Sequence, residues 1–441
     1  MTTSRKPEGS AALGYLVRGW PRLSQTFVLD EVLALERLGL RLRIFALSSS
    51  RTEALAQPEV AAVRAPVEFL DGGSRRAAVA AHLGALMASP WRYLRTAAYV
   101  ARHPEWDRAY HAASRGRCLT LAVRLAGTLR RAGGPGGEAG GAAVSRLHAH
   151  FAHDPALVAL LTHRLTGIPW SFTAHARDLF QVPPAAVAER VAAAETVVTC
   201  CAPNADYLRG LLGDGLGRRV HLVHHGVDVA SIQPGAPQGD GEQRRDAATP
   251  RIVSVGRLVE KKGFADLLAA CRRLKDGGQR FRCELYGDGP LREELAATVD
   301  RLGLGGEVVL AGSRTRPELL AALRRADVFA LTPFVTADGD RDGIPNVLLE
   351  AMACGLPVVS TSIDGVTEVV RDGVDGLLAA PRDVDAIAAH LAQLLADEQL
   401  RTRLGRAARR RVVESFAAAT TATTLAGLLA PAASPAGGTT P

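Results

Sequence analysis

The chain has 441 residues, which is long for one domain and sufficient for two domains that each bury a core. Hydrophobic residues make up 47% of the chain and charged residues 22%, so the composition is that of a globular protein and excludes a largely disordered one. The net charge of +8 comes from arginines scattered over predicted helix faces. With no zinc-finger or RNA-binding aromatic signature beside them, nucleic acid is not expected as a partner.

The N-terminal elements predict a parallel α/β domain. An apolar strand at residues 12–17 is followed by a loop, and Ser24 is a plausible N-cap for a helix whose apolar residues run at helical spacing from Phe27 to Leu38. Gly39 ends this helix, and a second strand covers residues 42–47. Strand, helix and strand in this order indicate the start of a parallel sheet.

Two segments rich in glycine and proline interrupt the pattern, at residues 133–141 and 233–250. The second is polar and almost free of large apolar residues, which is typical of a domain boundary. Beyond it, strands are predicted at 252–255, 282–286, 308–310, 328–331, 358–360 and 376–378, and helices at 264–274, 291–302, 317–325, 345–353, 384–395 and 398–429. This alternation predicts a second doubly wound parallel sheet.

The expected fold class is therefore α/β, with two doubly wound, Rossmann-like domains facing each other across a cleft. Ligands of such sheets bind outside the carboxyl ends of the strands. The predicted organisation is an N-terminal acceptor-binding domain at 1–232, a linker at 233–250, a nucleotide-sugar-binding domain at 251–410, a helix returning to the first domain at 411–430 and a disordered tail at 431–441.

The stretch from Asp342 to Val359 carries the clearest chemical signal. Pro345 suits the first turn of a helix, and Gly355 followed by Pro357 suits its end. The start of that helix offers free N–H groups and positive partial charge to an anion such as a diphosphate, and Gly343 allows a close backbone approach. Asp342 and Glu350 flank this site and could hold sugar hydroxyls; alternatively, Asp342 only caps the helix and Glu350 is solvated.

A second stretch, residues 255–263, follows the first predicted strand of the C-terminal half. Arg257 and Lys262 lie in this loop after Gly256. They could neutralise a diphosphate leaving group, arginine as a fork and lysine as a point charge, or they could be two surface cations.

Together these two stretches resemble those of the retaining GT-B glycosyltransferases of family four. That family carries a glycine-arginine-leucine…lysine-glycine loop and an E-x7-E motif in its C-terminal domain. The resemblance implies that Arg257 and Lys262 bind the donor phosphates, that Glu350 holds the ribose and that Asp342, where the family usually has Glu, contacts the donor sugar. It also implies a donor-binding set of Glu350, Gly343, Ile344, Pro345 and Gly256.

The N-terminal half resembles the exopolysaccharide, or colanic-acid-type, branch of this family. The supporting segments are residues 21–27, 148–152 and 171–178. The resemblance implies that His175 faces the donor sugar and acts with Asp342, Arg257 and Lys262 in catalysis, and it places Ser24 and Thr26 on the acceptor side. His148, His150 and His153 are crowded, but no suitably spaced carboxylate besides Asp154 accompanies them, so no metal site is predicted. Asp338 and Asp340 are interpreted as part of a polar loop.

The function predicted by this resemblance is a metal-independent, retaining hexosyltransferase without a cofactor. The expected donor is a UDP-sugar, glucose or N-acetylglucosamine, ahead of GDP-mannose. The acceptor is a sugar, a lipid-linked exopolysaccharide precursor or an aminocyclitol antibiotic core. A nucleotide-sugar epimerase, a phosphorylase and a non-catalytic sugar-binding protein remain alternatives, whereas a dehydrogenase would need a glycine pattern that the N-terminal loop lacks.

Six cysteines without a C-x-x-C pair, and no signal peptide, predict a reducing cytoplasmic location. No apolar run reaches the roughly 18–20 residues that span a bilayer. Residues 91–106 mix aromatics with arginines, which is compatible with a peripheral contact at the inner membrane face or with simple packing on the domain.

Overall fold

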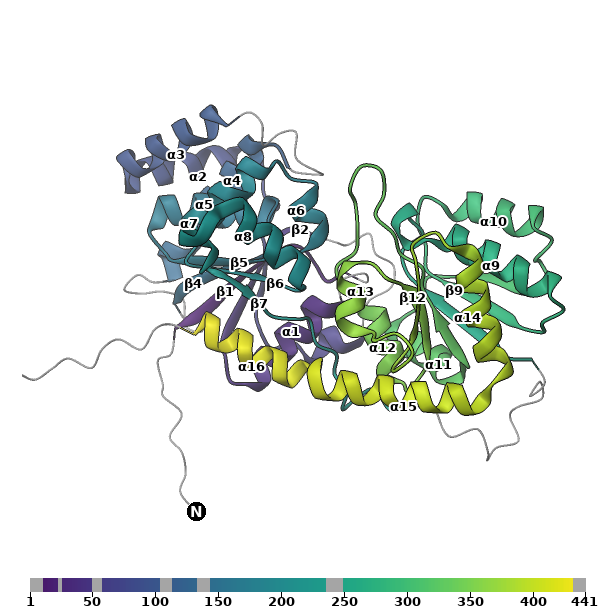
Figure 1. The fold of residues 1–441 in the computed structure, drawn as a ribbon. Helices are drawn as coiled ribbons and strands as arrows, with labels where there is room; N and C mark the ends of the chain where they lie inside the picture. The colour runs from purple at the N-terminus through teal and green to yellow at the C-terminus, as the bar shows by residue number, and fades with distance from the viewer. Residues whose placement is uncertain are drawn as a thin grey trace, which may run out of the picture.

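The computed structural model describes residues 11–22, 26–49, 58–103, 113–132, 143–234 and 249–430. Two domains lie side by side, each with helices packed around a parallel sheet (Figure 1). This confirms the predicted α/β fold with two Rossmann-like domains. The predicted loop at 133–141, most of the predicted linker and the predicted tail lie outside the described residues.

The N-terminal sheet has seven strands among the described residues, in the order β3-β2-β1-β4-β5-β6-β7, and every pairing is parallel. The chain order changes direction between β1 and β4, which is the switch point where ligands bind in such sheets. The elements are β1 Ala12–Trp20, α1 Thr26–Arg37, β2 Leu42–Ser49, η1 Pro58–Ala62, β3 Val67–Phe69, α2 Arg75–Ala88, α3 Pro90–Arg102, α4 Arg115–Ala132, β4 Val144–His150, α5 Asp154–Thr166, β5 Trp170–Ala174, α6 Ala176–Phe180, α7 Pro184–Ala193, β6 Thr196–Thr199, α8 Ala202–Gly217 and β7 Val220–Leu222.

The C-terminal sheet has six described strands in the order β10-β9-β8-β11-β12-β13, again all parallel, with the switch point between β8 and β11. The elements are β8 Arg251–Val255, η3 Glu260–Lys262, α9 Phe264–Asp276, β9 Arg282–Tyr286, α10 Arg292–Arg301, β10 Val308–Gly312, α11 Arg316–Arg325, β11 Val328–Ala330, α12 Asn346–Ala353, β12 Val358–Thr361, α13 Asp364–Val369, β13 Leu377–Ala379, α14 Val384–Ala396, α15 Glu398–Ser415 and α16 Ala418–Leu429.

The predicted single helix at 398–429 is wrong, because the chain forms two helices with a break at Phe416 and Ala417. The Phe416 side chain is buried, and its carbonyl accepts a hydrogen bond from the Val227 N–H at 2.9 Å. The Ala418 N–H in turn donates to the Val227 carbonyl at 2.9 Å. This bridge to the segment after β7 stops α15 and aims α16 at the N-terminal domain, where it packs against α1 (Figure 1).

Candidate functional site

The switch point of the C-terminal sheet gathers the residues predicted to bind the donor. Gly256 and Arg257 follow β8 directly, and Asp342 lies in the loop after β11, just before α12. The Arg257 side chain is exposed, and the described residues offer it no hydrogen-bond or ion-pair partner. It is therefore available to an incoming anion.

Lys262 and Asp342 are in direct contact. The Lys262 Nζ lies 2.5 Å from one carboxylate oxygen of Asp342, and the Lys261 Nζ lies 3.3 Å from the other. Burial alone would raise the pKa of Asp342, but the two ammonium groups outweigh it and hold that pKa below the usual value. Asp342 is thus a carboxylate, as the sugar contact implied by the family would need. Lys261, which the sequence analysis missed, also donates to Asp340 at 2.9 Å and so ties the polar loop to the site.

The start of α12 differs slightly from the prediction. Pro345 is the residue before the helix, with an extended ψ of 116°, and the helix begins at Asn346. No side chain caps this end, and the Leu348 N–H donates to the Pro345 carbonyl at 2.9 Å, so among the described contacts the Asn346 and Val347 N–H groups are the ones left for a ligand. The predicted role of the helix start is unchanged by this shift of one residue.

Gly343 shows how closely the two domains meet at this loop. A Cβ built on Gly343 would lie 3.3 Å from the Cys201 Sγ and 3.6 Å from the Cys200 Sγ of the N-terminal domain. Cys200 is also 3.9 Å from the Nδ1 atom of His175. The predicted donor loop therefore faces His175 across the domain junction, with the cysteine pair between them, while Ile344 is buried behind it.

Glu350 is not solvated, which removes one alternative left open by the sequence. Its Oε1 lies 3.3 Å from the Nε of Arg316, and both side chains are buried. Burial raises the pKa of Glu350 to about 7, although Arg316 opposes the shift. Arg316 also pairs with Asp30 of α1, so the carboxylate predicted to hold the ribose belongs to an ionic group shared by the two domains. Neither Arg316 nor Asp30 was singled out from the sequence, because a lone arginine in a helical segment carries no pattern.

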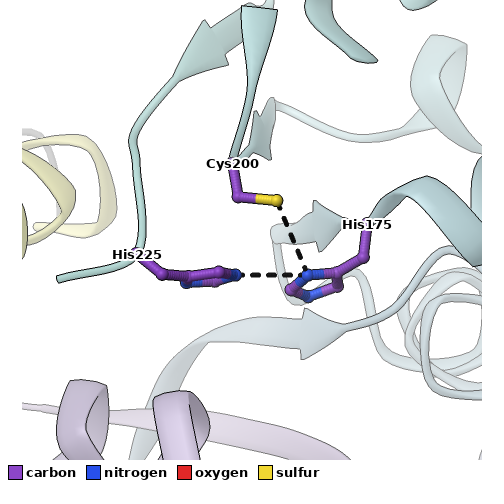
Figure 2. A group of neighbouring side chains, drawn as sticks. All are labelled: His175, Cys200 and His225. Carbon is purple, nitrogen blue, oxygen red and sulfur yellow. Dashed lines mark hydrogen bonds between the residues drawn. The ribbon is translucent and has the colours of Figure 1, made fainter. Parts of the chain in front are cut away.

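His175 lies between the end of β5 and the start of α6. Its backbone N–H donates to the Asp178 carboxylate at 2.9 Å. Its Nε2 is 3.3 Å from the Nδ1 of His150, and the Nε2 of His150 is 2.9 Å from the Oε1 of Glu31. The Nδ1 of His175 is 3.2 Å from the Nε2 of His225 (Figure 2). Burial first, and then His225, lower the pKa of His175 well below its ordinary value, so the imidazole is neutral.

The other histidines singled out by the sequence have structural partners. His148 contacts the hydroxyls of Ser171 and Thr173 at 2.9 and 3.0 Å through its two ring nitrogens, and the His153 Nδ1 accepts from the Asp154 N–H at 2.7 Å. On the acceptor side, Thr26 is the first residue of α1, whereas Ser24 lies outside the described residues.

Polar contacts between the domains continue beside the site. The Gln181 Nε2 donates to the Asp338 carbonyl at 2.9 Å, and the Arg341 guanidinium lies 4.2 Å from the centre of the Phe180 ring. Glu368 of α13 accepts from the Ala202 N–H at 2.8 Å and lies 2.8 Å from the His224 Nε2. The junction between the sheets is therefore held by polar contacts that a ligand can replace or complete.

Parts of the chain are similar to known glycosyltransferases. Residues 240–411 match the family described as Glycosyl transferases group 1. The chain is similar to the putative colanic acid biosynthesis glycosyltransferase WcaL of Escherichia coli (39% identical over 184 residues, covering 41% of this chain and 44% of that protein). It is also similar to the amylovoran biosynthesis glycosyltransferase AmsK of Erwinia amylovora (42% identical over 144 residues, covering 33% and 35%). The aligned part thus spans less than half the length of either relative.

Among solved structures, Anabaena Alr3699/HepE in complex with UDP-glucose superposes with a TM-score of 0.71 at 17% sequence identity, covering 95% of this chain and 99% of that chain. At this identity the likeness establishes the fold, which is the two-domain GT-B fold. Residues 240–411 therefore match the Glycosyl transferases group 1 family, within a chain whose fold is GT-B as a whole.

Proposed function

We propose that this protein is a glycosyltransferase that moves a hexose or N-acetylhexosamine from a nucleotide diphosphate sugar to an acceptor hydroxyl in exopolysaccharide biosynthesis. One observation carries the proposal. Lys262 pairs with the charged carboxylate of Asp342 just before the start of α12, and Arg257 follows β8, so these groups all lie at the switch point of the second sheet. This is where a doubly wound sheet binds ligands, and the group combines cations for a diphosphate with an acceptor for sugar hydroxyls.

The donor would bind by exchanging contacts. Arg257 has an exposed guanidinium fork for the phosphates, and Lys262 can leave the Asp342 carboxylate for the more highly charged diphosphate. Asp342, still held by Lys261, would then accept hydrogen bonds from the sugar. We propose UDP-glucose or UDP-N-acetylglucosamine as donor. Two observations support this choice: the chain is similar in sequence to WcaL and AmsK, and a protein of the same fold, HepE, was solved with UDP-glucose.

For the chemical step, we propose departure of the diphosphate stabilised by Arg257, Lys262 and the α12 N–H groups. The acceptor hydroxyl would attack on the face that the diphosphate leaves, giving retention without a resident metal. Neutral His175 would contact the donor sugar from the opposite domain. The anomeric proton coupling of the product tests this step, and an inverted product would contradict it.

A panel of donors tests the activity directly. UDP-glucose, UDP-N-acetylglucosamine and GDP-mannose are each added to the protein, and the thermal unfolding midpoint and sugar transfer are measured. A UDP-sugar should raise the midpoint and be consumed only when an acceptor is present. Hydrolysis without transfer would favour a phosphorylase or epimerase, and full activity in Glu350→Ala would contradict the donor site.

The acceptor we favour is lipid-linked, because α2 and α3 carry an exposed apolar face at the outer edge of the N-terminal domain (Figure 1). Val79, Leu83 and Met87 are four residues apart on α2 and are 55–83% exposed. Trp91 and Leu94 of α3 are 70% and 54% exposed. Exposed arginines accompany this face, at positions 75, 76, 92 and 95. Apolar residues flanked by cations are typical of helices that lie on an anionic lipid surface. None of the described helices is long and apolar enough to cross a membrane.

Sedimentation with vesicles tests this part of the proposal and the proposed place of the enzyme at the cytoplasmic membrane face. The protein should sediment with phosphatidylglycerol vesicles but not with phosphatidylcholine vesicles, and the Leu83→Asp/Trp91→Asp variant should stay in solution. Val413→Asp, which alters an exposed valine on α15, is the matched control. No sedimentation of the native protein would favour a small acceptor such as an aminocyclitol.

A further inference from the structure

Three potential metal ligands converge at the carboxyl edge of the N-terminal sheet. They are the Nδ1 of His175, the Sγ of Cys200 and the Nε2 of His225, and these atoms all lie within 4.8 Å of one another (Figure 2). Each residue follows a different strand, β5, β6 or β7. Because neighbouring parallel strands end at the same edge, three residues that are far apart in the sequence meet there.

The two distances from His175 to the other ligands are close to those of a tetrahedral zinc shell. Zinc binds imidazole nitrogen at roughly 2.0–2.1 Å and thiolate sulfur at about 2.3 Å. In a tetrahedron these bond lengths place two nitrogens about 3.3 Å apart and a nitrogen and a sulfur about 3.6 Å apart. The structure has 3.2 Å between His175 and His225 and 3.9 Å between His175 and Cys200. Both distances are within a few tenths of an ångström of these values, and the Cys200 Sγ lies within 4.8 Å of the His225 Nε2.

A chain of hydrogen bonds behind His175 orients it for this role. Glu31 accepts from the Nε2–H of His150, which leaves the Nδ1 of His150 as an acceptor for the Nε2–H of His175. The lone pair of His175 is then on Nδ1, toward Cys200 and His225. Zinc-ligating histidines usually donate their second ring N–H to a partner that fixes the tautomer; here that partner is His150, which Glu31 orients in turn.

The three ligands are shielded from solvent, since Cys200 is 4% exposed, His225 is 8% exposed and His175 is partly buried. The neighbouring group of Glu31, His148 and His150 is a poorer candidate, because both ring nitrogens of His148 already contact hydroxyls.

We propose that His175, Cys200 and His225 form a Zn²⁺ site with three protein ligands and an open fourth position. Binding replaces the S–H bond of Cys200 with an S–Zn bond and releases that proton to solvent, while the proton on the Nε2 of His225 moves to its Nδ1 so that Nε2 can bind zinc. The site lies beside Gly343 of the predicted donor loop. In this site zinc would bind the Nδ1 of His175, the ring nitrogen that otherwise contacts Cys200 and His225. Because His175 is proposed to contact the donor sugar, bound zinc would inhibit sugar transfer; this last consequence rests on the proposed function.

Binding is measured first without any donor. Metal-free protein is titrated with Zn²⁺ against a chromophoric chelator, and with Co²⁺ while the near-ultraviolet spectrum is recorded. One Zn²⁺ per chain and a thiolate-to-cobalt charge-transfer band are expected. Absence of the band in the native protein would overturn the site, and this readout needs no variant that might misfold.

Variants then identify the ligands. Cys200→Ala and His225→Ala should each weaken zinc binding by more than about a hundredfold, and Glu31→Gln by about 10–100-fold, the usual effect of losing an outer-shell partner. Cys118→Ala, which removes another buried cysteine of the same domain, should bind zinc like the native protein. Equal affinity in Cys200→Ala, His225→Ala and the native chain would contradict the proposal.

The regulatory consequence has its own measurement. Zinc should inhibit transfer by the native enzyme, and Cys200→Ala should keep its own zinc-free rate when zinc is added. If the protein proves to have no transferase activity, the zinc affinity and the cobalt band still decide the site. Zinc binding without inhibition would refute the regulatory role alone.

Discussion

Arg316 of α11 and Asp30 of α1 form a two-pronged ion pair between the domains, with Nη1–Oδ1 at 2.7 Å and Nη2–Oδ2 at 2.9 Å. The Nε of the same guanidinium lies 3.3 Å from Glu350. All three residues are at most 7% exposed. One arginine thus compensates two buried carboxylates, one from each domain, and links the junction to the residue predicted to hold the ribose.

Arg316→Met should destabilise the protein strongly. Removing one partner of a buried ion pair costs roughly 3–5 kcal/mol because the remaining charge is left uncompensated, and here two carboxylates remain. The free energy of unfolding is measured by chemical denaturation. Arg324→Met, which changes an exposed arginine on the same helix, is the control. Equal unfolding midpoints for both variants would show that the pair contributes nothing.

The raised pKa of Glu350 predicts a pH dependence of stability. The pKa is about 7 in the folded protein against an ordinary value of 4.5, so the folded state binds the proton more tightly than the unfolded state. The contribution of this group is therefore fully present in acid and is lost as the pH rises from about 4.5 to about 7. Thermal unfolding midpoints across this range should fall less steeply in Glu350→Gln than in the native protein; identical slopes would contradict the assignment.

Deprotonation of Glu350 should strengthen donor binding, although it lowers the stability of the fold. A carboxylate accepts hydrogen bonds from both ribose hydroxyls, whereas a carboxylic acid has lost part of that capacity. The dissociation constant for UDP should therefore rise as the pH falls below about 7, and the rise should be absent in Glu350→Gln. Calorimetry at a series of pH values measures it, and a flat profile in the native protein would argue against ribose binding by Glu350.

Replacing Arg257 and Lys262 by alanine should weaken donor binding and slow transfer. Hydrogen bonds to charged groups contribute about 1.5–3 kcal/mol each, so each change should cost roughly tenfold to a hundredfold in kcat/KM. Arg280→Ala, at an exposed arginine of the same domain, should change little. Unaltered affinity and turnover in the double variant would remove the basis of the proposed donor site.

Gly365→Ala should displace the donor loop. A Cβ at this position would lie 2.5 Å from the carbonyl carbon of Gly343 and 2.8 Å from the Ile344 nitrogen, which is closer than such contacts occur. Donor affinity should fall while the unfolding midpoint changes less than it does in Arg316→Met. Gly427→Ala on α16 has open space around it and should bind donor normally. Normal donor binding by Gly365→Ala would show that the loop has room to move.

The local pattern of the C-terminal half predicted its elements closely. The strand at 282–286 matches β9, and the predicted helix at 264–274 falls within α9. These predictions rest on the spacing of apolar residues along strands and helices and on the glycines that end helices. Such signals depend only on neighbouring residues in the chain. The break at Phe416 escaped detection because its cause is a hydrogen-bonded bridge to Val227, almost two hundred residues away along the chain.

The sequence alone determined the two parallel α/β domains and the positions of the predicted donor loops, since hydrophobic periodicity and the motifs around Arg257 and Asp342 are local properties. Only the tertiary structure decided which side chains face one another. It placed Arg316 between the carboxylates of Glu350 and Asp30, and it brought His175, Cys200 and His225 together from three strand ends. Such contacts depend on strand order and domain approach, which long-range packing sets and no short segment of the chain encodes.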